Sequence, residues 1–118
     1  MKKILICEDE IDALEALKNI LNKKDYEVLG VENGQDAIAK AREFKPDLIL
    51  LDIRMPKIDG LEVASEVRKF NKTTKIIFVT AFAGEELRKE AVRYDIADYL
   101  VKPIPREVII QKIEQALQ

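Results

Sequence analysis

The sequence predicts an α/β domain in which a five-stranded parallel sheet carries helices on both faces. Its apolar runs are short and continuous, as in strands that are buried on both sides. Segments with helical periodicity alternate strictly with these runs. The chain has 118 residues, 47% of them hydrophobic and 36% charged. This length allows one compact domain with a single core, which we expect to span residues 1–118.

Each element follows from its local pattern. The apolar runs predict strands over residues 4–7, 26–31, 48–51, 75–79 and 97–101. Apolar positions three and four apart predict helices over residues 11–21, 33–44, 59–70, 85–93 and from 105 to 117. Asn33 and Asp59 look like N-caps of the second and third helices. Pro46 closes the second helix, and Pro105 suits the first turn of the last one.

The alternation of strands and helices also predicts the topology. Parallel strands joined by right-handed crossovers leave few arrangements, and the doubly wound, flavodoxin-like order 2-1-3-4-5 is the economical one at this size. In this order the chain direction switches between strands 1 and 3. A crevice therefore forms beyond the carboxyl ends of these two strands.

Acidic residues follow both strands that flank the predicted crevice. Glu8 and Asp9 come after the first strand, and Asp52 comes directly after the third. Three carboxylates in one crevice repel each other unless a cation lies among them. The chain has no histidine, and its single cysteine, Cys7, lies inside an apolar run. The donors are therefore hard oxygens, which favour Mg²⁺ or Mn²⁺.

Thr80 ends the fourth strand and Lys102 follows the fifth. A carboxylate nucleophile, a divalent cation, a hydroxyl and an ammonium are the groups that phosphoryl transfer needs. Each residue alone has a simpler explanation: Glu8 and Asp9 can cap a helix, and Lys102 can be a surface lysine. Their joint placement at the ends of four strands favours the functional interpretation.

These motifs resemble those of response-regulator receiver domains of two-component signalling, the CheY-like family. The resemblance runs from Lys3 to the end of the chain. It rests on Glu8-Asp9, Leu51-Asp52-Ile-Arg-Met-Pro-x-x-Asp-Gly, Thr80-Ala81 and Lys102-Pro103. It implies that Asp52 accepts a phosphoryl group from a phosphohistidine on a sensor histidine kinase or a histidine phosphotransfer protein.

The resemblance also implies the ligands of the metal. Asp9 and Asp52 would bind it directly, Glu8 would bind it through a water, and Arg54 would bind it through its backbone carbonyl. Many members of the family have an aspartate where this chain has Glu8. The longer side chain still reaches a metal-bound water, so we expect an altered metal affinity.

The resemblance also implies which residues change conformation after phosphorylation. Thr80 and Lys102 would hold the phosphoryl oxygens, and Tyr99 would be the switch aromatic that fills the space left when Thr80 moves inward. The surface of the fourth helix, fifth strand and fifth helix would then bind a downstream protein, or the domain would pass the phosphoryl group on in a phosphorelay. The family also has a cis peptide before the proline that matches Pro103.

The first helix carries two apolar stripes. By resemblance, the stripe of Ala13, Ala16, Leu17 and Ile20 would face the sheet. Ile11 and Leu14 would then be partly exposed and would form, with Ile104, a docking patch for the helices of a kinase. The alternative is that both stripes are buried.

Two residues on the loops at the rim of the site bear on the lifetime of the phosphoryl group. Arg54 lies two positions after Asp52, and Phe82 lies two positions after Thr80. Neither side chain can act as a general base for an attacking water. Because both are bulky, we expect them to exclude water and to slow hydrolysis.

Other function classes fit the sequence less well. A phosphatase or mutase with an Asp nucleophile would carry Asp-x-Asp on its first strand, whereas Asp52 follows the third. A flavin-binding module would need a Ser/Thr/Gly-rich loop where this chain has Glu8-Asp9-Glu10. There is no P-loop motif. We therefore expect a phosphoacceptor switch, whose catalysis is limited to its own phosphorylation and slow dephosphorylation.

The composition of the chain limits the classes of partner and the cellular location that we expect. The net charge is −2 and neither terminus is strongly basic, so we expect no nucleic-acid partner. No apolar run has the length of a membrane span and no signal peptide is present, which predicts a cytoplasmic location. We expect a monomer or a weak, phosphorylation-dependent dimer without a fused output domain. Whether the chain is a whole protein or a receiver cut from a longer one stays open.

Overall fold

The sheet has the predicted topology. The computed structural model describes residues 1–118, with five parallel strands in the order β2-β1-β3-β4-β5. The strands are β1 (Lys3–Cys7), β2 (Glu27–Val31), β3 (Leu48–Leu51), β4 (Lys75–Thr80) and β5 (Asp98–Val101). The helices are α1 (Ile11–Asn22), α2 (Gly34–Phe44), α3 (Gly60–Phe70), α4 (Glu85–Val92) and α5 (Arg106–Ala116). None of these helices combines the length and the apolar character that a membrane crossing requires.

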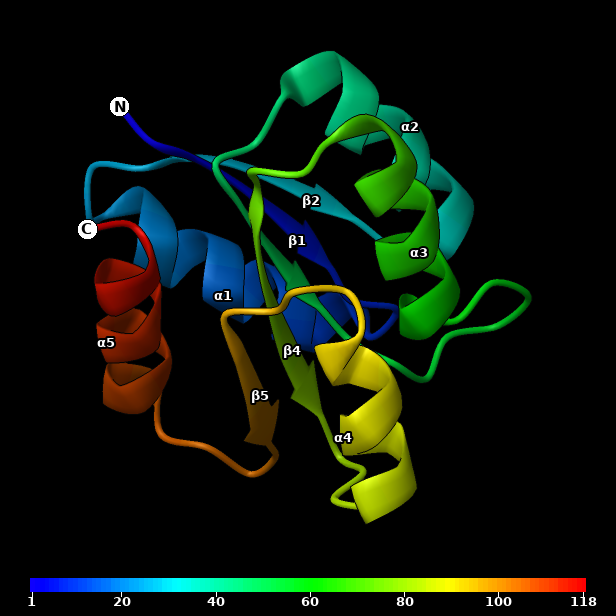
Figure 1. The fold of residues 1–118 in the computed structure, drawn as a ribbon. Coiled ribbons are helices and arrows are strands. Elements are labelled where there is room, and N and C mark those ends of the chain that lie inside the picture. Colours follow the sequence, from blue (N-terminus) through cyan, green and yellow to red (C-terminus); the bar gives the residue numbers. More distant parts are fainter.

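Helices cover both faces of the sheet (Figure 1). Helices α1 and α5 contribute to one hydrophobic core, and α2, α3 and α4 contribute to the other. Successive strand residues alternate between the two cores: Leu5 and Cys7 of β1 belong to the second, whereas Ile4 and Ile6 belong to the first. This period of two follows from the pleat of the strands, which points neighbouring side chains to opposite faces.

The predicted N-caps are present. Asn33 accepts a hydrogen bond from the backbone N–H of Asp36 at 2.8 Å, and Asp59 accepts one from that of Glu62 at 2.9 Å. Each side chain satisfies a donor that the first helical turn leaves without a partner. Pro105 lies one position before the first turn of α5, not within it. Its extended backbone, with ψ at 146°, places it outside the helix.

The predicted orientation of α1 is wrong. Leu14 is 4% exposed and packs toward the sheet together with Leu21, whereas Ile11 is 56% exposed as expected. The reason lies on β2, where Gly30 leaves room for the Leu14 side chain: a Cβ on Gly30 would come within 2.8 Å of the Leu14 Cδ1. The other stripe, of Ala13, Ala16, Leu17 and Ile20, instead lines a groove between α1 and α5.

Arg68 joins the end of α3 to the loop between α4 and β5. Its side chain is buried, and its guanidinium donates to three backbone carbonyls, those of Tyr94 (2.7 Å), Asn71 (3.0 Å) and Asp95 (3.1 Å). At its other end, α4 starts after Gly84 without a side-chain cap, and the helix buries Ala91 near its last turn. Helix α4 is therefore fastened mainly at its C-terminal end.

Candidate functional site

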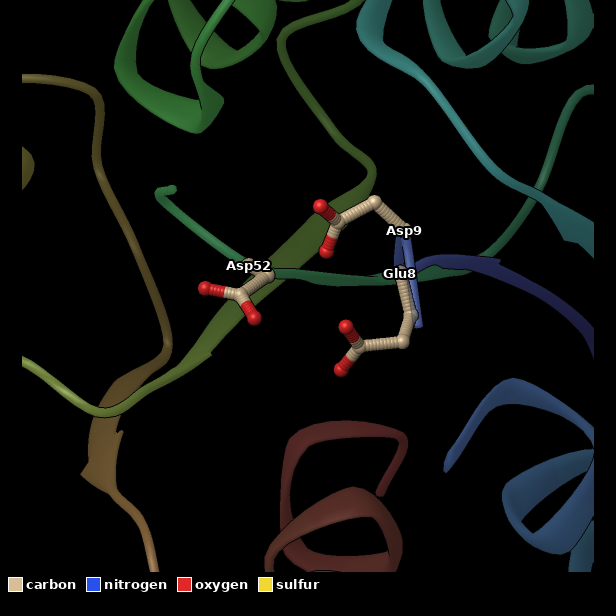
Figure 2. A group of neighbouring side chains, drawn as sticks. All are labelled: Glu8, Asp9 and Asp52. Atoms are coloured by element: carbon tan, nitrogen blue, oxygen red, sulfur yellow. The ribbon is translucent and has the colours of Figure 1, made fainter. Parts of the chain in front are cut away.

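The acidic residues predicted from the sequence meet at the carboxyl edge of the sheet. Cys7 of β1 pairs with Leu51 of β3, so the residues that follow them leave neighbouring strands side by side. The carboxylate oxygens of Glu8, Asp9 and Asp52 lie within 4.8 Å of one another. Figure 2 shows the three side chains turned toward a common space. Glu8 and Asp52 are buried, whereas Asp9 is exposed.

Lys102 reaches the same space from the end of β5. Its Nζ donates to Glu8 Oε1 at 2.8 Å and to Asp52 Oδ2 at 3.0 Å. Its backbone N–H donates to the Thr80 carbonyl at 2.7 Å, which fixes the loop beside β4. The Lys102–Pro103 peptide bond is cis, as the resemblance implies.

At this cluster, burial and the neighbouring charges shift the pKa values of Glu8 and Lys102 in opposite directions. Burial raises the pKa of Glu8, although hydrogen bonds from Lys102 and from the Glu10 backbone N–H oppose the shift. Burial disfavours the Lys102 ammonium, but its hydrogen bonds to Glu8 and Asp52 outweigh this effect, so its pKa is raised. One ammonium against three carboxylates leaves two negative charges in excess.

The donor set fits a hard divalent cation. Two excess negative charges and three clustered carboxylates match the charge and the oxygen ligands of Mg²⁺ or Mn²⁺. Cys7 is not a competing ligand. Burial, and then the neighbouring carboxylate of Glu8, raises the pKa of its thiol to about 12. The thiol therefore stays protonated, as expected for a cysteine that lies in an apolar run and is buried.

Thr80 and Tyr99 lie on neighbouring strands next to the cluster. Thr80 is fully buried, and its Oγ1 accepts the backbone N–H of Phe82 at 3.4 Å. The Tyr99 side chain is turned inward: the residue is 5% exposed, and its hydroxyl donates to the Phe82 carbonyl at 2.7 Å. The ring packs near Phe78, with 6.1 Å between the centroids.

The two rim residues contact each other, which the sequence did not indicate. The guanidinium carbon of Arg54 lies 4.3 Å from the centre of the Phe82 ring. The backbone N–H of Arg54 donates to Asp52 Oδ1 at 3.3 Å, so the loop that carries Arg54 also orients the Asp52 carboxylate. Both side chains remain exposed at the surface.

Gly60 was also missed as a site residue. A Cβ at this position would lie 2.2 Å from the backbone oxygen of Asp52 and 2.9 Å from the Cα of Ile53. The Gly60 N–H donates to the Ile53 carbonyl at 2.8 Å. The first residue of α3 therefore packs directly against the backbone of Asp52, the residue after β3. The Asp59-Gly60 pair belongs to the motif that carries the family resemblance, but the sequence predicts only the capping role of Asp59.

The predicted docking patch is rearranged. Ile11 is exposed and Ile104 is half-buried, but Leu14 cannot belong to the patch because it packs against β2. An apolar groove of about 570 Å³ runs between α1 and α5 and reaches the acidic cluster at Glu8 and Lys102. Its walls include Ala13, Ala16, Leu17 and Ile20 of α1, with Ile104 and Ile109 opposite.

Comparisons with known proteins agree with this architecture. The family model for the response regulator receiver domain matches residues 4–114. The chemotaxis protein CheY of Listeria monocytogenes is 33% identical over 117 residues, which cover 98% of each chain. The transcriptional regulatory protein ResD of Bacillus subtilis is 42% identical over 110 residues, which cover 92% of this chain and 45% of ResD.

Solved structures lead to the same family. A CheY-like receiver domain protein from Methanospirillum hungatei superposes with a TM-score of 0.96 at 29% identity, over 99% of this chain and 94% of its own. The response regulator TrrA from Thermotoga maritima, solved in complex with Mg²⁺ and BeF, gives a TM-score of 0.89 at 38% identity, over 99% and 100% of the two chains. With the fold, the acidic cluster and the family match all in agreement, the chain belongs to the receiver domains of two-component response regulators.

Proposed function

We propose that Asp52 accepts a phosphoryl group from a phosphohistidine on a sensor histidine kinase or a histidine phosphotransfer protein. The observation that carries this proposal is the setting of its carboxylate. Asp52 is 8% exposed, and its carboxylate lies 3.0 Å from the Lys102 ammonium and shares one space with the carboxylates of Glu8 and Asp9. A carboxylate in this setting can attack a negatively charged phosphoryl group, because the ammonium and a bound cation would offset the repulsion between the two.

The transfer needs no general base. Asp52 reacts as a carboxylate: one of its oxygens bonds to phosphorus while the P–N bond of the phosphohistidine breaks, and the imidazole nitrogen keeps that electron pair. Lys102 and the Thr80 hydroxyl would hold the phosphoryl oxygens. A divalent cation bound by Glu8 through a water and by Asp9, Asp52 and the Arg54 carbonyl would supply the positive charge that offsets the charge of those oxygens.

We propose that phosphorylation changes the conformation of one surface of the domain. Phosphorylation would act through Thr80 and Tyr99 on the face formed by α4, β5 and α5, which would bind a protein target or precede onward transfer of the phosphoryl group. Beyond its own phosphorylation and slow dephosphorylation, we propose no enzymatic turnover. The proposed setting is the cytoplasm, where the free thiol of Cys7 stays reduced.

Phosphorylation should depend on a divalent cation. Incubation with acetyl phosphate and Mg²⁺ should add the mass of one phosphoryl group to the intact protein, and EDTA should abolish the addition because the excess negative charge then repels the donor. Mn²⁺ should replace Mg²⁺. Steady release of phosphate without an adduct would instead favour a phosphatase. Labelling that is equally fast in EDTA would contradict the proposed metal site.

The partner kinase should dock along the groove between α1 and α5. Ala16 is exposed on this groove, so Ala16→Glu should place a charge on its apolar wall without disturbing the core. We expect phosphotransfer to fall at least about tenfold, the effect of about 1.4 kcal/mol of lost binding. The measurement is transfer from a radiolabelled sensor kinase that labels the wild type.

Asn19→Glu is the matched control, because it adds the same charge on an exposed position of α1 outside the groove. It should transfer like the wild type, and both variants should keep their labelling by acetyl phosphate. Equal loss of transfer in both would point to the overall charge of α1 and would contradict docking in the groove.

A further inference from the structure

Phe82 contacts the acidic site and the switch residue at the same time. Its ring lies under the Arg54 guanidinium, with 4.3 Å between the guanidinium carbon and the ring centre. Its backbone N–H donates to Thr80 Oγ1, and its carbonyl accepts the Tyr99 hydroxyl at 2.7 Å. One residue therefore touches the loop after Asp52, the end of β4 and the aromatic ring of β5.

The segment that carries Phe82 has little else to hold it. Residues 81–84 are all exposed, and no side chain caps the start of α4. A Cβ on Gly84 would meet nothing within 4 Å. The stack of Arg54 on Phe82 joins this segment to the loop after β3, and a cation over an aromatic face is an attractive contact.

Tyr99 depends on the position of this segment. A buried tyrosine hydroxyl needs a hydrogen-bond partner, and the partner here is the Phe82 carbonyl. The guanidinium carbon of Arg88 in α4 lies over the Tyr99 ring, 5.0 Å from its centre. If residues 81–84 moved away, the hydroxyl would lose its acceptor and the inward position would lose its advantage over a solvated one.

We propose that Phe82 is a positioning residue for Tyr99. The stack of its ring under Arg54 holds the Phe82 carbonyl where the Tyr99 hydroxyl reaches it, so that Tyr99 is inward before any phosphoryl group arrives. The consequence for signalling rests on the proposed function. With Tyr99 inward, the surface of α4, β5 and α5 already has part of the conformation that it would adopt after phosphorylation. Arg54 links this conformation to the loop that carries Asp52.

The test measures the exposure of Tyr99 in unphosphorylated protein without metal or phosphodonor. The chain contains three tyrosines, so biosynthetic fluorotyrosine gives three ¹⁹F resonances, and Tyr99→Phe assigns the relevant one. A soluble paramagnetic probe broadens exposed resonances. Tyr26 and Tyr94 are half-buried and serve as internal references. In the wild type, the Tyr99 resonance should broaden less than either reference.

Phe82→Leu should remove this protection, so that the Tyr99 resonance broadens as much as those of Tyr26 and Tyr94. Arg54→Gln should act in the same direction, because the cation over the ring is lost. Phe82→Tyr keeps the ring and should preserve the protection of the Tyr99 resonance, beside a fourth resonance from the added tyrosine. Phe82 and Arg54 are both exposed, and an unchanged Tyr26 resonance in each variant would show that the fold is intact.

Three results would overturn the proposal: an exposed Tyr99 in the wild type, full protection in Phe82→Leu, or loss of protection in Phe82→Tyr. None of these depends on phosphorylation. Failure of the proposed function would appear separately, as the absence of a phosphoryl adduct on the wild type after incubation with acetyl phosphate and Mg²⁺.

Discussion

Asp52→Asn should abolish phosphorylation by acetyl phosphate and by a partner kinase. The amide that replaces the carboxylate is a poor nucleophile, and it removes one of the three charges that would hold the cation. It also weakens the contact with the Lys102 ammonium, 3.0 Å away, because a neutral amide oxygen replaces a charged carboxylate oxygen. We expect labelling to fall below detection, measured by intact mass and by transfer of radiolabel.

The variant should fold about as stably as the wild type, because relief of the repulsion among three carboxylates offsets the weaker contact with Lys102. Unfolding in urea checks this point. Asp25→Asn is the matched control: it makes the same change in the loop after α1, at φ 68°, a left-handed conformation that asparagine tolerates. It should be labelled normally. A label mapped to Asp9 or Asp59 in the wild type would overturn the assignment.

Gly60→Ala should destabilise the fold and slow phosphorylation at once. The added methyl would lie 2.2 Å from the Asp52 backbone oxygen and 2.9 Å from the Ile53 Cα, and backbone atoms cannot rotate out of the way. The loop that carries Asp52 must therefore shift. We expect a loss of about 2–3 kcal/mol in the free energy of unfolding, measured in urea. Because the nucleophile is displaced, labelling should slow by on the order of a hundredfold.

Gly84→Ala is the control for this substitution. A Cβ at Gly84 would meet nothing within 4 Å, so the only cost is that of alanine at the N-cap of α4, below about 1 kcal/mol. Labelling should stay within about twofold of the wild type, since the added methyl contacts no residue that positions Asp52. If the two glycine variants behaved alike, the loss would reflect the backbone freedom of glycine and not the close contact with Asp52.

Local patterns were enough to predict most of the fold and the members of the acidic cluster. The strands were recognisable because both of their faces are buried, and the N-caps Asn33 and Asp59 because capping needs particular side chains. Glu8, Asp9 and Asp52 could be grouped because parallel strands end at one edge of a sheet. These inferences require only periodicity, chain order and the chemistry of single residues.

The errors have a common physical origin. The orientation of α1 depends on which strand residue leaves space for Leu14, and the residue is Gly30, sixteen positions away on another element. The contact between Arg54 and Phe82 depends on how the loops after two different strands approach each other. The contact of Gly60 with Asp52 depends on how the single loop after β3 folds back on its own start. Such contacts arise from packing in three dimensions, which periodicity along the chain does not encode.

Arg68 fixes the C-terminal end of α4 in place. Two of its hydrogen bonds, to the carbonyls of Tyr94 and Asp95, hold the chain just beyond the last turn of α4. The first turn of α4 instead follows an exposed glycine and has no side-chain cap. If α4 tilts, we expect it to turn about this fixed C-terminal end, so that a small tilt at Arg93 displaces Glu85 furthest. The end of α4 nearest the acidic site would then be displaced most, and this movement would require no flexible linker.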